Sequence, residues 1–124
     1  GTIINKAAGT HNGKMLFGGR AYYSSIFEPG DHEYDCIDIN QELVKHPEIA
    51  LLKVNIEGAE YDLLSHIIGA GLHKHIKNIQ VQFHQIEGVP YGTWYKEIAE
   101  KLKETHSITW RYLYCWENWR LKNA

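Results

Sequence analysis

The chain has 124 residues, of which 44% are apolar and 23% are charged. This length suits one hydrophobic core, so we expect residues 1–124 to form a single domain. A formal net charge of −2 with scattered Lys and Arg argues against a nucleic-acid partner. No apolar run reaches the roughly 20 residues that span a bilayer, which argues against a membrane partner. Cys36 and Cys115 lie far apart in the sequence, and this cysteine usage suits a cytoplasmic location.

The first third of the chain predicts short strands separated by turns. The expected strands are Thr2–Ala8, Lys14–Phe17, Ala21–Ile26 and Tyr34–Ile37. Gly18 and Gly19 lie between the second and the third of them, which is typical of a hairpin turn. Asp38 precedes Gln41 by three residues, a capping-box spacing that predicts a short helix ending near Pro47.

The remaining chain alternates between strand and helix patterns. Ile49–Asn55 is a nearly continuous apolar run, which predicts a strand buried on both faces of a parallel sheet. A helix is expected at Ala59–Ile68, a strand at Lys77–His84 and a longer helix at Tyr91–Thr105. The aromatic segment Ser107–Leu121 fits either one long strand or a strand pair. This order of elements predicts an α/β fold.

One segment of the chain resembles a known family. Leu51–Asp62 reads L-L-K-V-N-I-E-G-A-E-Y-D, which resembles the "L-L-K-I-D-x-E-G-A-E" segment of FkbM-type, S-adenosylmethionine-dependent methyltransferases. Shorter likenesses occur in the same order along nearly the whole chain. They are at Asn5–Gly9, Ser24–Ile26, Ile79–His84 and Trp116–Trp119.

The resemblance implies both a fold and an activity. The fold would be α/β: a partial Rossmann-like class I methyltransferase fold, with a mostly parallel sheet, flanking helices and the first two strands absent. The activity would be S-adenosylmethionine-dependent O-methyl transfer to a hydroxyl of a small molecule or sugar. The complete fold of the family has the strand order 3-2-1-4-5-7-6. In this order the absent strands 2 and 1 lie between Thr2–Ala8, which corresponds to strand 3, and Ile49–Asn55, which corresponds to strand 4. These two segments should therefore lie apart, or else Thr2–Ala8 and Tyr34–Ile37 should pair beside Ile49–Asn55 in a smaller mixed sheet.

The resemblance also implies site residues. His84, at the predicted end of a strand, would be the catalytic base, and Asn55 and Glu57 would orient the substrate or the cofactor. Ala7, Ala8 and Asn55 would contact the cofactor, S-adenosylmethionine. The sequence departs from the family at Asn55 and Gln82, where amides replace two acids, which disfavours a metal held by anionic oxygens.

Each of these residues also has a structural interpretation. Asn55 and Glu57 equally suit the start of a helix, and Glu60 is interpreted as structural. His73 and His75 have no evident third metal ligand, so we expect no metal site. The lack of a glycine-rich cofactor loop leaves a second hypothesis open, a non-catalytic α/β interaction module or a truncated methyltransferase remnant without cofactor.

Two rows of side chains carry further alternatives. Gln80, Gln82 and His84 alternate onto one strand face, which then meets either a wet cleft or other polar groups. A second row in the C-terminal segment is aromatic and consists of Trp110, Tyr112, Tyr114 and Trp116. Such a row fits a stacking platform for a sugar, but it more often forms core or the interface of a homo-oligomer.

Overall fold

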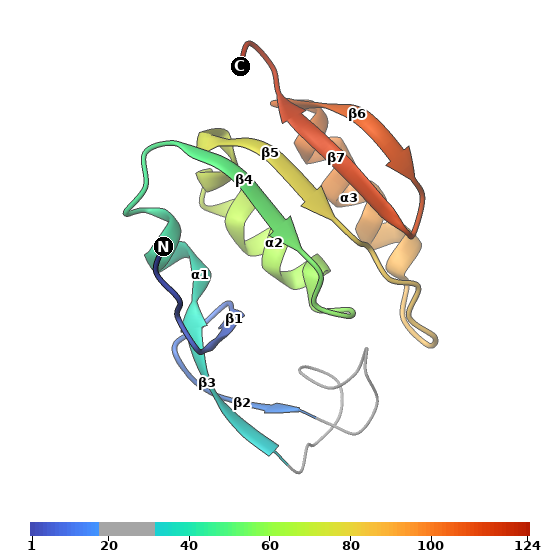
Figure 1. The fold of residues 1–124 in the computed structure, drawn as a ribbon. Coiled ribbons are helices and arrows are strands. Elements are labelled where there is room, and N and C mark those ends of the chain that lie inside the picture. The colour runs from blue at the N-terminus through green and yellow to red at the C-terminus, as the bar shows by residue number, and fades with distance from the viewer. Residues whose placement is uncertain (18–31) are drawn as a thin grey trace.

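A computed structural model describes residues 1–17 and 32–124 of the chain (Figure 1). The N-terminal sheet has three strands in the order β1-β3-β2, and they are β1 (Ala7–Gly9), β2 (Gly13–Phe17) and β3 (His32–Asp38). β1 runs parallel to β3, and β2 runs antiparallel to it. The expected strand at Ala21–Ile26 lies outside the described residues. α1 (Ile39–Leu43) follows β3 as expected, but it ends before Pro47. The Asp38 side chain caps it by accepting from the Asn40 N–H, whereas the Asp38 N–H donates to Asn12 Oδ1, so the expected capping box with Gln41 does not form.

The second sheet has four strands in the order β4-β5-β7-β6. These strands are β4 (Ile49–Val54), β5 (Ile76–Val81), β6 (His106–Tyr112) and β7 (Trp116–Leu121). β4 and β5 are parallel, whereas β7 runs antiparallel to both of its neighbours. The helices between the strands are α2 (Glu60–Gly69), the short 3₁₀ helix η1 (Leu72–His75) and α3 (Tyr91–Lys103).

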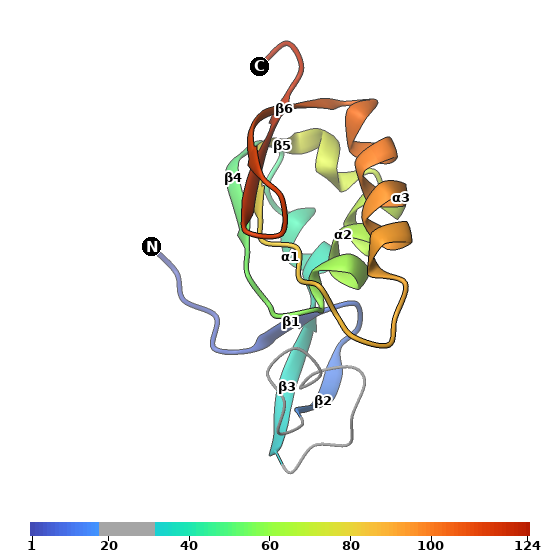
Figure 2. The same ribbon diagram turned by 90° about the vertical axis from the view of Figure 1, so that its right-hand side faces the viewer.

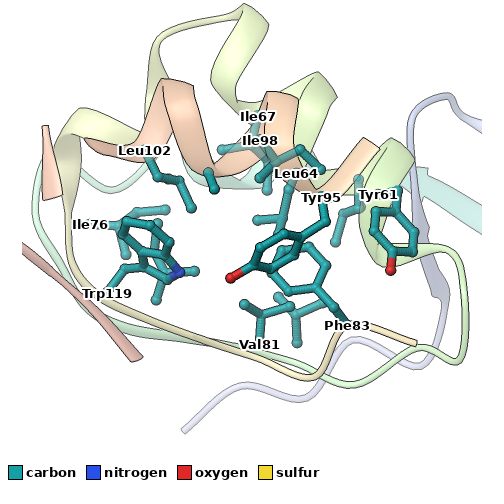
Figure 3. Packing of buried hydrophobic residues seen from close by; sticks show 14 of the residues in the cluster. Tyr61, Leu64, Ile67, Ile76, Val81, Phe83, Tyr95, Ile98, Leu102 and Trp119 are labelled. Carbon is teal, nitrogen blue, oxygen red and sulfur yellow. The ribbon is translucent and has the colours of Figure 1, made fainter. Parts of the chain in front are cut away.

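The hydrophobic core lies between the second sheet and the helices. Figure 2 shows α2 and α3 on the same side of this sheet, and Figure 3 shows the apolar side chains that meet between them. Trp119 from β7, Leu64 and Ile67 from α2 and Leu102 from α3 are fully buried. Full burial of a large apolar side chain contributes roughly 1.5–3 kcal/mol, so this layer stabilises the second sheet and its helices together.

The structure corrects the expected sheet. Instead of one mostly parallel Rossmann-like sheet, the described residues form two mixed sheets in which most strand pairs are antiparallel. The aromatic C-terminal segment is one reason. It turns back at Leu113–Cys115, where Tyr114 adopts a φ of 57° and the Cys115 N–H donates to the Tyr112 carbonyl. The segment is therefore a strand pair, and β7 enters the sheet against the direction of β5.

β4 confirms one prediction and contradicts another. It is a strand and it pairs with β5, as expected for Ile49–Asn55 and Lys77–His84. It is not buried on both faces, because Leu51 is 47% exposed and Lys53 is exposed as well. The reason is that the described helices cover one side of the sheet only, so every second residue of β4 faces the open side.

β1 and β4 belong to different sheets. This agrees with the first expectation for them, that Thr2–Ala8 and Ile49–Asn55 lie apart. β1 is also shorter than expected, since it begins at Ala7 and includes Gly9. A side-chain hydrogen bond of 2.7 Å between Asp38 Oδ1 and His66 Nε2 connects the end of β3 to α2. In the described part of the chain, no helix is both long enough and apolar enough to cross a membrane.

Candidate functional site

The loop between β4 and α2 makes a tight turn that positions Glu60. Glu57 has a φ of 51° and Gly58 a φ of 109°, so both residues lie in the left-handed region that favours glycine. This turn brings the Gly58 N–H to 2.7 Å from Glu60 Oε2. The Glu60 side chain is 0% exposed although it carries a carboxylate. A buried carboxylate is costly unless its oxygens accept hydrogen bonds, and the turn supplies the first of them.

The other oxygen of Glu60 holds His84. Glu60 Oε1 accepts from the His84 backbone N–H at 2.7 Å and from His84 Nδ1 at 2.9 Å. Tyr61, the next residue in α2, donates its hydroxyl to the His84 carbonyl at 2.6 Å. Burial raises the pKa of the Tyr61 hydroxyl, so it remains a protonated donor at neutral pH. Backbone and ring of His84 are thus fixed by two neighbouring residues of α2.

The contact with Glu60 determines which nitrogen of His84 is available. An ionised carboxylate only accepts hydrogen bonds, so in the neutral imidazole the proton lies on Nδ1 and the lone pair lies on Nε2. No residue in the described ranges forms a hydrogen bond with Nε2. The side chain is 21% exposed, which leaves it open to solvent. A carboxylate on Nδ1 and a free Nε2 are the arrangement of a general base.

The segment that carries His84 is anchored on both sides. Phe83 is 2% exposed and Ile86 is 0% exposed, so the backbone around His84 cannot move away from α2 without losing core contacts. The Phe83 ring also packs edge-on against Tyr95 of α3, with 4.9 Å between the ring centroids. The expected strand Lys77–His84 ends earlier, at Val81, and the chain after it turns towards Glu60. His84 therefore does not continue the row of Gln80 and Gln82.

The other predicted site residues are divided: Asn55 and Glu57 lie on the turn between β4 and Glu60, whereas Ala7 and Ala8 lie in the N-terminal sheet. Asn55 and Glu57 are both exposed, and no residue of the described chain hydrogen-bonds to either side chain. Ala7 and Ala8 are half-buried in β1, which belongs to the other sheet. Sequence reasoning missed the part that Glu60 plays at the site, although the residue lies in the E-G-A-E segment. The signal was its place in the first turn of α2, beside the carboxyl ends of β4 and β5.

A second buried carboxylate joins α3 to β7. Glu117 is 1% exposed, accepts from the Trp119 Nε1–H at 2.7 Å, and lies 3.1 Å from the Tyr95 hydroxyl. Arg111 donates to the Tyr95 oxygen at 3.3 Å. Burial raises the pKa of the Glu117 carboxyl. The group lies among core side chains, so we interpret it as a link between elements.

Two histidines are buried at the other end of the second sheet. His106 is 1% exposed, and its ring nitrogens lie 2.7 Å from Thr105 Oγ1 and 2.8 Å from the Ile76 carbonyl. His73 of η1 is 4% exposed and stacks on His106, with 6.2 Å between ring centroids. Burial lowers the pKa of both imidazoles, so both stay neutral at pH 7. Among the described residues, no group of three or more His, Cys, Asp and Glu side chains could hold a metal ion.

The expected aromatic row divides at the turn between β6 and β7. Trp110 and Tyr112 lie side by side on β6, with 6.4 Å between ring centroids, and they are 40% and 72% exposed. Trp116 faces Tyr112 from β7 and carries the Lys53 ammonium over its ring at 5.0 Å. Tyr114 lies in the turn and packs instead against Tyr91 and Tyr95. The row is therefore not one face of a single strand.

The residues expected to contact S-adenosylmethionine do not lie together in the described structure. The three residues expected to contact it, Ala7, Ala8 and Asn55, are split between two sheets, and Asn55 is exposed at the end of β4. A dinucleotide-like cofactor site needs a glycine-rich turn between a strand and a helix, and the described ranges contain no such unit before β4. No protein-family model matches the chain, and the comparisons with curated proteins and with solved structures find no match either.

Proposed function

We propose that this chain is the C-terminal part of an FkbM-type, S-adenosylmethionine-dependent O-methyltransferase whose acceptor is a hydroxyl of a small molecule or sugar. The observation that carries the proposal is the buried Glu60 carboxylate on Nδ1 of His84. Methyl transfer to a hydroxyl needs alignment of the reactants and a group that takes the hydroxyl proton. His84 Nε2 is the group that meets the second need.

The role of each residue follows from its contacts. Glu60 fixes the His84 tautomer and would stabilise the imidazolium that forms when Nε2 accepts a proton. Tyr61 holds the His84 backbone, so the ring keeps its position during the reaction. Asn55 and Glu57 lie on the turn just before Glu60, and their exposed side chains are free to orient an acceptor. These roles require no metal ion.

The arrangement of the second sheet supports the proposed family. The resemblance implies the order 4-5-7-6 on one side of the parent sheet, and the second sheet has the order β4-β5-β7-β6. The proposed site also lies beside the ends of β4 and β5, where α/β sheets commonly bind ligands. A mostly parallel Rossmann-like sheet would then arise only in the complete domain, from strands that the described residues do not include.

One observation favours a second candidate function, a non-catalytic interaction module. The side chains of Asn55 and Glu57 form no hydrogen bond with the described residues. Leu51 and Trp110 are exposed on the side of the second sheet that faces away from α2 and α3. An interaction domain would expose side chains in this way, and it would need neither S-adenosylmethionine nor a free Nε2 on His84.

Calorimetry separates the two functions. The complete gene product, including any residues that precede Gly1, should bind S-adenosylmethionine and transfer labelled methyl groups from it to a component of a metabolite extract. His84→Gln should keep the binding and lose about 100-fold or more of the transfer rate, because it removes the proton acceptor. Absence of cofactor binding at millimolar concentrations contradicts the family. Normal transfer by His84→Gln contradicts the role of the histidine alone.

A further inference from the structure

Figure 2 shows that one side of the second sheet faces away from α2 and α3. Strand pairing places its side chains in rows across the sheet. The rows, read from β4 towards β6, are Leu51, Asn78 and Arg120; then Lys53, Gln80, Asn118 and Trp110; then Trp116 and Tyr112. We call these residues the open face. It combines aromatic rings, primary amides and two cations.

The open face carries positive charge without negative charge. Lys53 and Arg120 are exposed on it, and Arg120 Nη2 donates one hydrogen bond to the Ala124 carbonyl at 3.3 Å, which leaves its other N–H groups for a ligand. The sequences of β4, β5, β6 and β7 contain one acidic residue, Glu117, and its carboxylate turns to the opposite side, where it contacts Tyr95 of α3. The chain as a whole has a net charge of −2, so this face differs in sign from the rest of the molecule. Charge complementarity therefore favours an anionic occupant.

Asn118 points to a ligand independently of the charge. Its side chain is 5% exposed, and its Nδ2 donates to Thr109 Oγ1 at 2.7 Å and to Asn78 Oδ1 at 3.4 Å. Its Oδ1 has no hydrogen-bond partner in the described part of the chain. A buried polar atom without a partner is costly, so Oδ1 needs a water, an ion or a ligand group to satisfy it. Asn118 lines an open depression of about 430 Å³ together with Gln80, Trp110 and Arg120.

The aromatic rings indicate what kind of ligand fits. Trp110 is 40% exposed beside this depression, whereas Lys53 already lies over the ring of Trp116. A free indole face next to amides suits a sugar ring, whose C–H groups pack on the aromatic plane while its hydroxyls bond to the amides. Arg120 adds a guanidinium that pairs with a planar acid.

We propose that the open face binds an anionic sugar, a pyranose ring that carries a carboxylate or a phosphate. Its ring lies on Trp110, its hydroxyls bond to Gln80 and Asn118, and its acidic group pairs with Arg120. A second copy of this chain would place cations of the two open faces against each other. A nucleic acid needs more than two cations along its phosphates for stable binding. This inference does not rest on the proposed methyltransferase activity.

The test is an NMR titration of the isotope-labelled complete gene product, including any residues that precede Gly1. The probe is glucuronate, and the two control ligands are glucose, which has the ring without the charge, and acetate, which has the charge without the ring. We expect saturable shifts of the Trp110 indole signal and of the Gln80 amide signal, with no shift at the buried Trp119. Glucose should bind about tenfold more weakly, because it lacks the charge-assisted contact with Arg120.

Two variants assign the contacts. Arg120→Gln should weaken glucuronate binding to the level of glucose, and Trp110→Ala should abolish the binding of both sugars. Val44→Ala is the matched control, since Val44 is 64% exposed at the end of α1 and away from the open face. Equal unfolding midpoints of all variants would establish that they are folded. Absence of saturable shifts, or an unchanged affinity of Arg120→Gln for glucuronate, overturns the proposal. The proposal also fails if the same signals shift when the protein is diluted without sugar, since that result means self-association, or if a single-stranded oligonucleotide binds more tightly than glucuronate.

Discussion

At the scale of single residues, the site depends on the hydrogen bonds of Glu60. Its two oxygens accept from three groups, the Gly58 N–H, the His84 N–H and His84 Nδ1, while the side chain is fully buried. No other described side chain links the loop after β4 with the segment after β5 in this way. The sequence interpretation of Glu60 as structural is compatible with these contacts but incomplete, because the same carboxylate also sets the orientation of His84.

Glu60→Gln should destabilise the chain by about 1–3 kcal/mol, because the amide nitrogen cannot accept and leaves at least one buried N–H unpaired. Urea unfolding at neutral pH measures this difference. The matched control is Glu57→Gln, three residues earlier on the same loop, where the side chain is exposed and the change should stay within about 0.5 kcal/mol. Equal losses in the two variants would contradict the role assigned to the Glu60 carboxylate.

At the scale of elements, sequence periodicity predicted the helices and the strands of the second sheet well. The apolar positions of Ala59–Ile68 and Tyr91–Thr105 recur at helical spacing, and both segments form helices that bury most of those positions. Periodicity could not decide which faces of β4 are covered, because an apolar run looks the same whether a helix packs on it or not. The hairpin of β6 and β7 was left open for a similar reason, since Tyr114 at a φ of 57° has no glycine to mark the turn.

The buried carboxyl of Glu117, which connects β7 to α3 through Tyr95, should make the stability of the chain depend on pH. Because burial raises the pKa of Glu117 above 4.5, the folded chain holds this proton more tightly than the unfolded chain does. Its contribution to stability is therefore fully present below about pH 4.5 and is lost as the pH rises through the raised pKa.

Glu117→Gln removes this proton but keeps an oxygen for Tyr95 and Trp119. The free energy of unfolding of the variant minus that of the wild type should therefore increase between about pH 4 and about pH 7. Chemical unfolding of both proteins across this range measures the difference, and subtraction cancels the other titrating groups. A difference that is constant or that decreases with pH would show that the folded state does not favour the neutral carboxyl.

At the scale of the whole molecule, the sequence predicted an α/β chain, but it left open whether β1 and β4 lie in separate sheets. The parallel pairing of β4 with β5 follows from the strand–helix–strand order. The pairing of β1 with β3 joins segments that are separated by turn-rich sequence, and local patterns carry little information on such long-range pairing. The same limit applies to the site. His84 was predicted from its place near a strand end, whereas its partner, 24 residues earlier, depends on how α2 packs beside β5.

The Glu60–His84 contact depends on tertiary packing, because it joins the loop after β4, the start of α2 and the chain after β5. NMR of the ¹⁵N-labelled histidines, at a pH where the imidazole is neutral, measures the tautomer of His84 directly. We predict the form with the proton on Nδ1 in the wild type, and loss of this preference in Glu60→Gln. A His84 ring with its proton on Nε2 in the wild type would contradict the assignment of Nε2 as the proton acceptor.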